Sequence, residues 1–136
     1  MHQFTVYAAN TPIQYAIAEY IDNEDEYLKL SSFYQQKRDF FNNLLAEIGF
    51  DLVPSSGTYF QTINFSAYSD ENDFQLAERL TKKYGIAAIP MSSFYHDKNN
   101  TANLRFCFAK TEKTLLEAAK KLSNFHKEAK KQLNLF

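Results

Sequence analysis

Residues 103–110 read NLRFCFAK, and this stretch decides the fold class. Leu104, Phe106 and Phe108 occupy every second position, which is the spacing of a strand that buries one face. Arg105 stands between them and so belongs to the opposite face of the strand. A guanidinium is costly to bury unless an anion meets it, so the partner of Arg105 is the first question that this sequence raises.

The segments around this strand are short apolar runs and amphipathic helices. FDLVP and TYFQTINF flank SSG and predict a pair of strands over residues 50–65, and IAAIP at 86–90 predicts a short buried strand. A helix is predicted from a cap at Asp70 or Asn72 to Gly85, and another precedes the C-terminus. This order predicts an α+β fold, a small and mostly antiparallel sheet covered by helices on one face.

The N-terminal third is predicted to be helical after an extended or irregular opening over residues 1–10. A cap at Asn10 or Thr11 predicts a first helix. A second and longer helix, from about residue 27 to 48, is predicted to end at Gly49.

Composition limits the class of protein. The chain has 136 residues, 45% of them hydrophobic, with 13 Phe and 9 Tyr, which is ample material for one packed domain. A formal net charge of −1 does not suggest nucleic acid or an anionic membrane as partner. No apolar run approaches the ~20 residues of a membrane span, and no signal-peptide pattern is visible. A cytoplasmic location is therefore expected, and a single cysteine agrees with a reducing compartment.

Common catalytic patterns are not found. His2, His96, His126 and Cys107 are scattered without the spacing of metal ligands. The three glycines do not cluster into a phosphate-binding loop, and there is no GxSxG stretch for a serine nucleophile. No metal site is therefore predicted.

Two interpretations of Arg105 are open from the residues alone. The arginine could be solvated, or paired with an internal acid such as Asp51 or Glu47. Alternatively, an arginine held rigidly on a strand offers two parallel N–H donors to a carboxylate ligand. The aromatic stretches GTYF at 57–60 and SFYHD at 93–97 would then line a partly dry pocket around it.

Four stretches of the chain, in order, resemble one family. They are HQFTVYAANTPIQYAIAEYI, PSSGTYFQTINFS, YGIAAIPMSSFY and LRFCFAKTEKTLLEAAKKL. Together they resemble the C-terminal part of fold-type I pyridoxal-phosphate aminotransferases, and most of all the methionine and kynurenine–oxoglutarate subgroup. The resemblance covers residues 2 to about 123. It implies that residues 1–24, an extended segment and a helix, belong to a seam with the large domain, and that 25–136 form the small C-terminal domain.

The resemblance implies roles for four residues. Arg105 matches the arginine that binds the α-carboxylate of the substrate in this family. Tyr7 matches an aromatic residue that crosses the dimer interface into the pocket of the neighbouring subunit. Tyr59 and Phe60 match residues beside the substrate pocket, although ordinary core packing is an equal alternative for Tyr7, Tyr59 and Phe60.

The cofactor of the family is pyridoxal 5′-phosphate, and its lysine lies upstream of the HQ stretch. Here only Met1 precedes that stretch, and none of the lysines present has an equivalent context. The resemblance therefore implies a C-terminal fragment that binds no cofactor covalently and is inactive alone. Its partners would be amino acid and 2-oxo acid substrates, the missing large domain and, in the complete enzyme, a second subunit.

A different class of protein remains open, a stand-alone α+β module for ligand binding or dimerisation without catalytic activity. A natural truncation, one subunit of a split enzyme and an expressed domain are equally compatible with the sequence.

Overall fold

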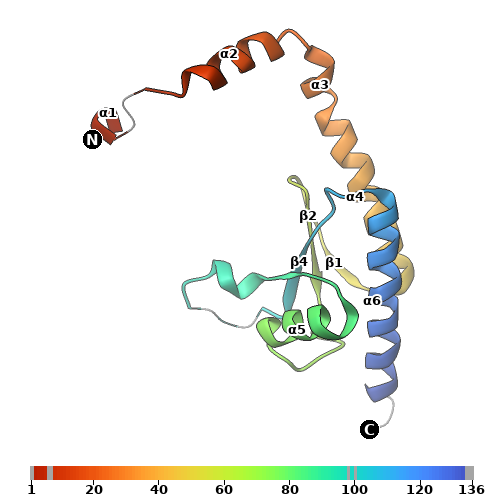
Figure 1. The fold of residues 1–136 in the computed structure, drawn as a ribbon. Coiled ribbons are helices and arrows are strands. Elements are labelled where there is room, and N and C mark those ends of the chain that lie inside the picture. Colours follow the sequence, from red (N-terminus) through yellow and green to blue (C-terminus); the bar gives the residue numbers. More distant parts are fainter. Residues whose placement is uncertain (1, 6–7, 98, 100, 134–136) are drawn as a thin grey trace. The chain divides into compact units, whose positions relative to one another are not determined.

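The computed structural model describes residues 2–5, 8–97, 99 and 101–133, and divides into two units, Met1–Phe33 and Tyr34–Phe136 (Figure 1). Each unit is described by itself. The predicted assignment of residues 1–24 to a large-domain seam and 25–136 to a small domain stays a prediction.

The first unit is helical. It contains α1 (His2–Thr5), α2 (Thr11–Tyr20) and α3 (Glu24–Leu28), and α4 (Leu30–Ile48) begins within it. The side chain of Asn10 accepts a hydrogen bond from the amide of Ile13, and a proline follows in the first turn, so the predicted start of α2 is confirmed. No residue of α2 or α3 is buried.

Two predictions for this region are wrong. The opening is not extended throughout, because His2–Thr5 forms a short helix. The single helix predicted from residue 27 to 48 is interrupted at Lys29, which separates α3 from α4. The end of α4 is as predicted, since Gly49 follows it with a φ of 96°, a conformation that glycine adopts without a steric penalty.

The second unit is built on a four-stranded antiparallel sheet of order β1-β2-β4-β3. The strands are β1 (Asp51–Val53), β2 (Phe60–Asn64), β3 (Ile89–Pro90) and β4 (Asn103–Cys107). β4 is a central strand, and in its register Arg105 lies opposite Thr62 on β2 and opposite Ile89 on β3. The predicted α+β fold is confirmed.

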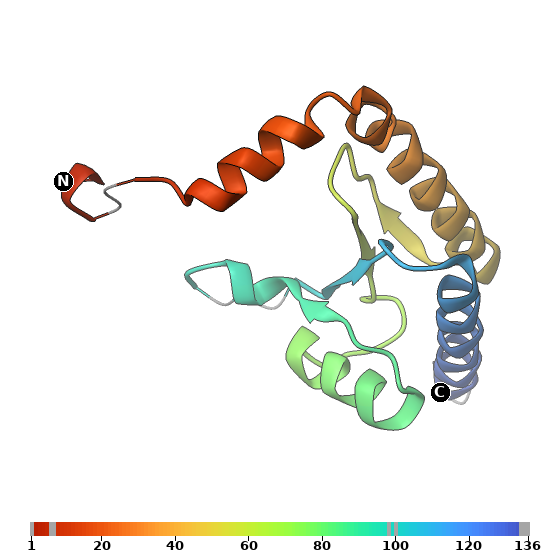
Figure 2. The same ribbon diagram turned by 45° about the horizontal axis from the view of Figure 1, so that its top comes forward.

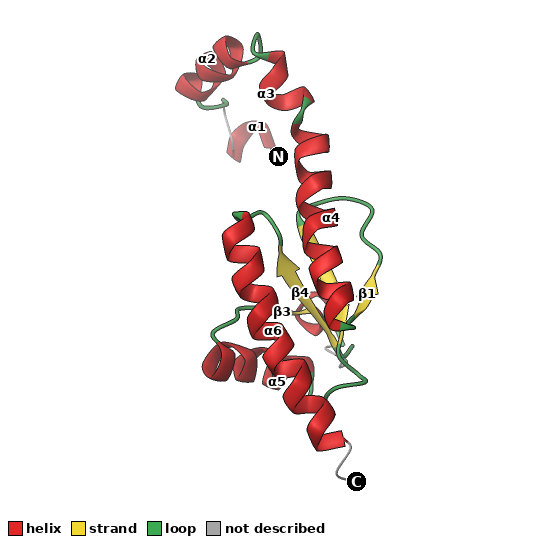
Figure 3. Ribbon diagram, turned by 90° about the vertical axis from the view of Figure 1, so that its right-hand side faces the viewer, coloured by secondary structure: helices red, strands yellow, loops and turns green. Residues whose placement is uncertain are grey.

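One face of the sheet is buried beneath helices. Ile63 and Leu104, which are register partners, are fully buried. They pack in one core with residues of α4, of α5 (Asp73–Arg79) and its extension η1 (Leu80–Tyr84), and of α6 (Glu112–Leu133). Figures 1 and 2 show α4 and α6 on the same side of the strands, and in Figure 3 both helices lie in front of them. The opposite face carries Arg105.

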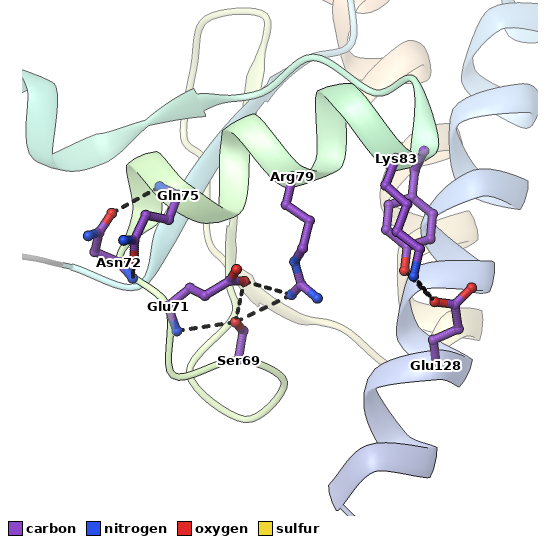
Figure 4. Close-up of polar contacts among 8 residues, drawn as sticks. Ser69, Glu71, Asn72, Gln75, Arg79, Lys83 and Glu128 are labelled. Carbon is purple, nitrogen blue, oxygen red and sulfur yellow. Dashed lines mark hydrogen bonds and ion pairs between the residues drawn. The ribbon is translucent and has the colours of Figure 1, made fainter.

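Polar contacts fix α5 and η1 against their neighbours (Figure 4). Asn72 caps α5 reciprocally with Gln75, as the sequence predicts for one of its two candidate caps. Lys83 on η1 is 2.5 Å from a carboxylate oxygen of Glu128 on α6. The predicted helix to Gly85 therefore forms, but its last turn, η1, is a π-helix rather than an α-helix.

Candidate functional site: an arginine between two aromatic rings

Arg105 extends from β4 toward the sheet face opposite the helix-covered core. Its neighbours Leu104 and Phe106 are buried, whereas Arg105 itself is half-buried. The sequence prediction for the side of the strand is confirmed. Since β4 is hydrogen-bonded to strands on both sides, the backbone that carries Arg105 is held in place along both edges.

The guanidinium of Arg105 lies between two aromatic rings. Its Cζ atom is 4.0 Å from the ring centroid of Phe60 and 4.4 Å from that of Phe94. Both distances are within the range of cation–π attraction. The two rings come from different parts of the chain, Phe60 from β2 and Phe94 from the short 3₁₀-helix η2 (Met91–Phe94).

The Nε atom of Arg105 is buried and lacks a hydrogen-bond partner among the residues that the structure describes. Within the same residues Arg105 forms no ion pair, so the alternative of an internal partner such as Asp51 or Glu47 is not supported. An unpaired buried donor typically costs about 1–3 kcal/mol, which a bound acceptor would offset.

Phe60 and Tyr59 differ in what they contact, and their predicted place beside a substrate pocket stays a prediction. Phe60 is half-buried and stacks on the guanidinium. Tyr59 is 45% exposed, and its ring contacts Phe60 with the centroids 4.5 Å apart rather than Arg105. The carbonyl of Tyr59 accepts a hydrogen bond from the amide of Phe108 at 2.9 Å, which ties this end of β2 to the chain beyond β4.

Tyr7, the remaining predicted site residue, lies outside the residues that the structure describes. Its role stays a prediction.

Phe94 was not among the predicted site residues. The aromatic stretch SFYHD indicated a pocket lining in general terms, but nothing in its spacing singles out the ring that stacks on Arg105. The contact depends on the path of the chain between β3 and β4, which local sequence patterns do not determine.

A groove with a volume of about 450 Å³ lies beside the same strand, between the segment 85–89, the end of β4 and the N-terminal half of α6. Arg105 and Cys107 contribute to its lining, but neither Phe60 nor Phe94 does. The groove is therefore distinct from the space around the guanidinium.

The described lysines do not fit covalent attachment of pyridoxal phosphate. Such a lysine is normally desolvated, with a lowered pKa that makes its amine nucleophilic. None of the lysines whose burial the structure describes is buried. At Lys83 the hydrogen bonds to Glu128 and Tyr84 raise the pKa instead.

Two absences hold for the part of the chain that the structure describes. No cluster of three or more His, Cys, Asp or Glu side chains has the arrangement of a metal site there. None of the helices there is long and apolar enough to cross a membrane.

Comparison with known proteins gives consistent matches. The family model described as aminotransferase class I and II matches residues 1–122. Methionine aminotransferase of Escherichia coli is 43% identical over 123 residues, which are 90% of this chain and 32% of the relative. Kynurenine–oxoglutarate transaminase of Dictyostelium discoideum is 32% identical over an alignment of 139 positions, gaps included, that covers 86% of this chain and 32% of the relative.

Solved structures agree with these matches. The crystal structure of YbdL from Escherichia coli, reported with a methionine aminotransferase function, superposes with a TM-score of 0.83 at 43% identity and covers 90% of this chain. The structure of N-succinyldiaminopimelate aminotransferase from Mycobacterium tuberculosis gives a TM-score of 0.77 at 34% identity. The chain spans about a third of the length of these proteins.

Proposed function

The chain belongs to the class I and II aminotransferases, and from this membership we propose that Arg105 binds the α-carboxylate of an amino acid or 2-oxo acid substrate. The observation that carries the proposal is a guanidinium held between Phe60 and Phe94 with its Nε buried and unpaired among the described residues. A planar guanidinium donates two parallel hydrogen bonds to a carboxylate. A bound carboxylate would supply the acceptor that those residues lack.

The two rings limit the directions from which a carboxylate can approach Arg105. Both rings lie within cation–π distance of the guanidinium, so they cover part of its surface with aromatic carbon, while the N–H donors lie along its edge. A substrate bound through this edge has its α-carbon at a fixed distance from β4. Orientation of this kind lowers the entropic cost of the reaction that follows.

We propose that the substrates are methionine, aromatic amino acids or kynurenine and the corresponding 2-oxo acids. The names of two relatives support this class. The side chains around Arg105 agree with it, because Tyr59, Phe60 and Phe94 present aromatic surface suited to an apolar substrate side chain.

In the complete enzyme, we propose, this chain works with a large domain and a second identical subunit, and Tyr7 reaches the pocket of that neighbour. Pyridoxal 5′-phosphate, when bound, supplies the electron-withdrawing group that the amino transfer requires. The described lysines do not fit its covalent attachment. The part assigned to this chain is to bind and orient the substrate.

Calorimetric titration of the purified chain tests the carboxylate site. L-methionine and its 2-oxo acid should bind, whereas 3-(methylthio)propylamine, which lacks the carboxylate, should bind far more weakly. Arg105→Gln should weaken methionine binding by about 10- to 100-fold, since hydrogen bonds to charged groups are worth roughly 1.5–3 kcal/mol. Lys127→Gln, an exposed charge on α6, serves as the control. Equal binding of methionine by the Arg105→Gln variant would refute the assignment.

A second candidate is a stand-alone carboxylate-binding or dimerisation module. It is favoured by the second unit, which packs its own core of sheet and helices. Both candidates predict no methionine-dependent turnover by this chain alone with added pyridoxal phosphate. They differ when the chain is mixed with a protein corresponding to the other two-thirds of a relative. Turnover in the mixture supports the aminotransferase part, and its absence together with intact methionine binding supports the module.

A further inference from the structure

The Phe94 ring is held on Arg105 by something other than its own burial. The ring is 55% exposed, so the burial of apolar surface contributes little to its position. Its backbone belongs to η2, a single 3₁₀ turn, which is a weak element by itself. An anchor elsewhere in the turn must therefore determine where the ring lies.

That anchor is the contact between Ser92 and Asp73. Ser92 is 1% exposed and Asp73, the first residue of α5, is 2% exposed. The amide of Ser92 donates to Oδ2 of Asp73 at 2.8 Å, and its hydroxyl donates to Oδ1 at 2.7 Å. Each carboxylate oxygen thus accepts one hydrogen bond from the same residue, and such charge-assisted bonds are strong and directional.

The same carboxylate also reaches the start of the strand that carries the arginine. The hydroxyl of Thr101 lies 3.5 Å from Oδ2 of Asp73, and it accepts a hydrogen bond from the amide of Asn103, the first residue of β4. Asp73 therefore joins the turn of Phe94 to the beginning of the strand of Arg105. The turn that carries Phe94 and the strand that carries Arg105 are thus both connected to the buried carboxylate of Asp73, the first through Ser92 and the second through Thr101.

We propose that Asp73 is a positioning residue of the carboxylate site: through Ser92 it keeps the Phe94 ring stacked on Arg105. The inference rests on the proposed function of Arg105 and extends it to residues that do not touch the substrate. Without the anchor, η2 loses its buried connection, and the exposed ring no longer stays in contact with the guanidinium. The guanidinium then regains side-chain freedom that it must lose again on binding.

Nuclear magnetic resonance of the ¹⁵N-labelled full chain measures this contact directly. The sequence has three arginines, at positions 38, 79 and 105, so the Nε–H signal of Arg105 can be assigned by its disappearance in Arg105→Lys. A proton between two aromatic rings is shifted upfield by their ring currents. The signal should move toward the ordinary arginine position in Phe94→Leu, which calibrates the loss of one ring.

Asp73→Asn should reproduce a large part of the Phe94→Leu shift, and Ser92→Ala, which removes the hydroxyl bond but keeps the amide bond to Asp73, a smaller but measurable part, although neither changes a group that contacts Arg105. Ser92→Thr, which keeps a hydroxyl, should restore the wild-type signal. Ser93→Ala is the matched control, because it removes an exposed hydroxyl from the same turn. The affinity for the 2-oxo acid of methionine should fall by about two- to fivefold in Ser92→Ala, the size expected for one partly exposed cation–π contact.

The outcomes separate this inference from the proposed function. An unmoved Arg105 signal in Ser92→Ala, with the Phe94→Leu shift present and the methyl signals of the core unchanged, would overturn the positioning role. An Arg105 signal that does not respond to the 2-oxo acid in the wild-type chain would instead overturn the carboxylate site. If Asp73→Asn unfolds, Ser92→Ala and its Ser92→Thr rescue decide the question.

Discussion

The imidazole of His126 lies directly against Gly49: a Cβ atom added to that glycine would be 3.7 Å from Nε2 of the histidine. The histidine is on α6, and the glycine ends α4. His126 also contacts the rings of Phe50 and Tyr68, with centroids 5.2 Å and 4.8 Å away. This cluster therefore joins the C-terminal end of α4 to the C-terminal half of α6.

Gly49→Ala should destabilise the second unit through the backbone rather than through a clash. The added Cβ would be in ordinary contact with His126, but the φ of 96° is one that L-residues rarely adopt. The expected loss is about 1–2 kcal/mol in the free energy of unfolding, measured by urea denaturation. Gly57→Ala is the control, because no atom lies within 4 Å of its added Cβ, and it should be neutral or slightly stabilising. Equal effects of the two substitutions would contradict the account.

His126 should make the stability depend on pH. Burial of the ring, and then the positive charge of Lys130, lower the pKa of His126 from its ordinary value of 6.5. As pH falls below about 6.5, the unfolded chain takes up a proton that the folded chain does not yet bind, so the free energy of unfolding decreases. The effect is absent well above that pH.

Urea denaturation at a series of pH values between about 5 and 8 measures this dependence. His126→Phe keeps the ring contacts and should flatten the slope in the acidic part of the range. His96→Gln, at an exposed histidine, is the matched control. A wild-type slope that survives in His126→Phe would assign the titration to another group.

Phe60 and Tyr59 should differ in their effect on carboxylate binding. Phe60→Leu removes a ring from the guanidinium and should weaken the binding of methionine by about two- to fivefold. Tyr59→Leu should have a smaller effect on a short carboxylate such as pyruvate, because the Tyr59 ring contacts Phe60 and not Arg105. Calorimetric titration with both ligands makes the comparison. Equal losses for pyruvate in the two variants would show that the rings act as one unit.

The apolar residues of α2 should promote self-association of the isolated chain. Ile13, Ile17 and Tyr20 are each more than half exposed, and the helix has no buried residue. Exposed apolar surface of this kind favours association or dye binding. Light scattering should show a mass that rises with concentration, and less so in Ile17→Lys. A constant monomer mass at high concentration, without dye binding, would contradict this expectation.

Much of the fold could be predicted because it depends on local patterns. The alternation of Leu104, Phe106 and Phe108 identified the central strand and the face of Arg105, and Asn10 and Gly49 marked helix ends through side-chain capping and backbone conformation. The break at Lys29 could not be predicted, since no glycine or proline marks it. Residues 27–48 have the periodicity of one continuous helix.

The candidate site could be predicted from the sequence only in part. The family resemblance named Phe60, and its place on the same face as Arg105 follows from the register of β2 and β4, in which it is two residues from Thr62, the partner of Arg105. The position of Phe94 could not be predicted in this way, because it depends on hydrogen bonds between Asp73 and Ser92, which are 19 residues apart. Contacts of this kind arise from the path of a connection, and no periodic pattern encodes them.

The strand order implies that the two aromatic rings beside Arg105, Phe60 and Phe94, differ in how easily they move. Phe60 and Arg105 lie on adjacent strands in the middle of the sheet, where amide protons exchange with solvent only when the sheet itself opens. Phe94 lies on a single turn next to β3, a two-residue edge strand, so its opening requires the loss of few hydrogen bonds, the two from Ser92 to Asp73 among them. The Phe60 ring therefore stays on the guanidinium as long as the domain is folded, whereas the Phe94 ring can separate from it in a local fluctuation. For the proposed carboxylate ligand, entry and release on the side of Phe94 would leave the register of the sheet undisturbed.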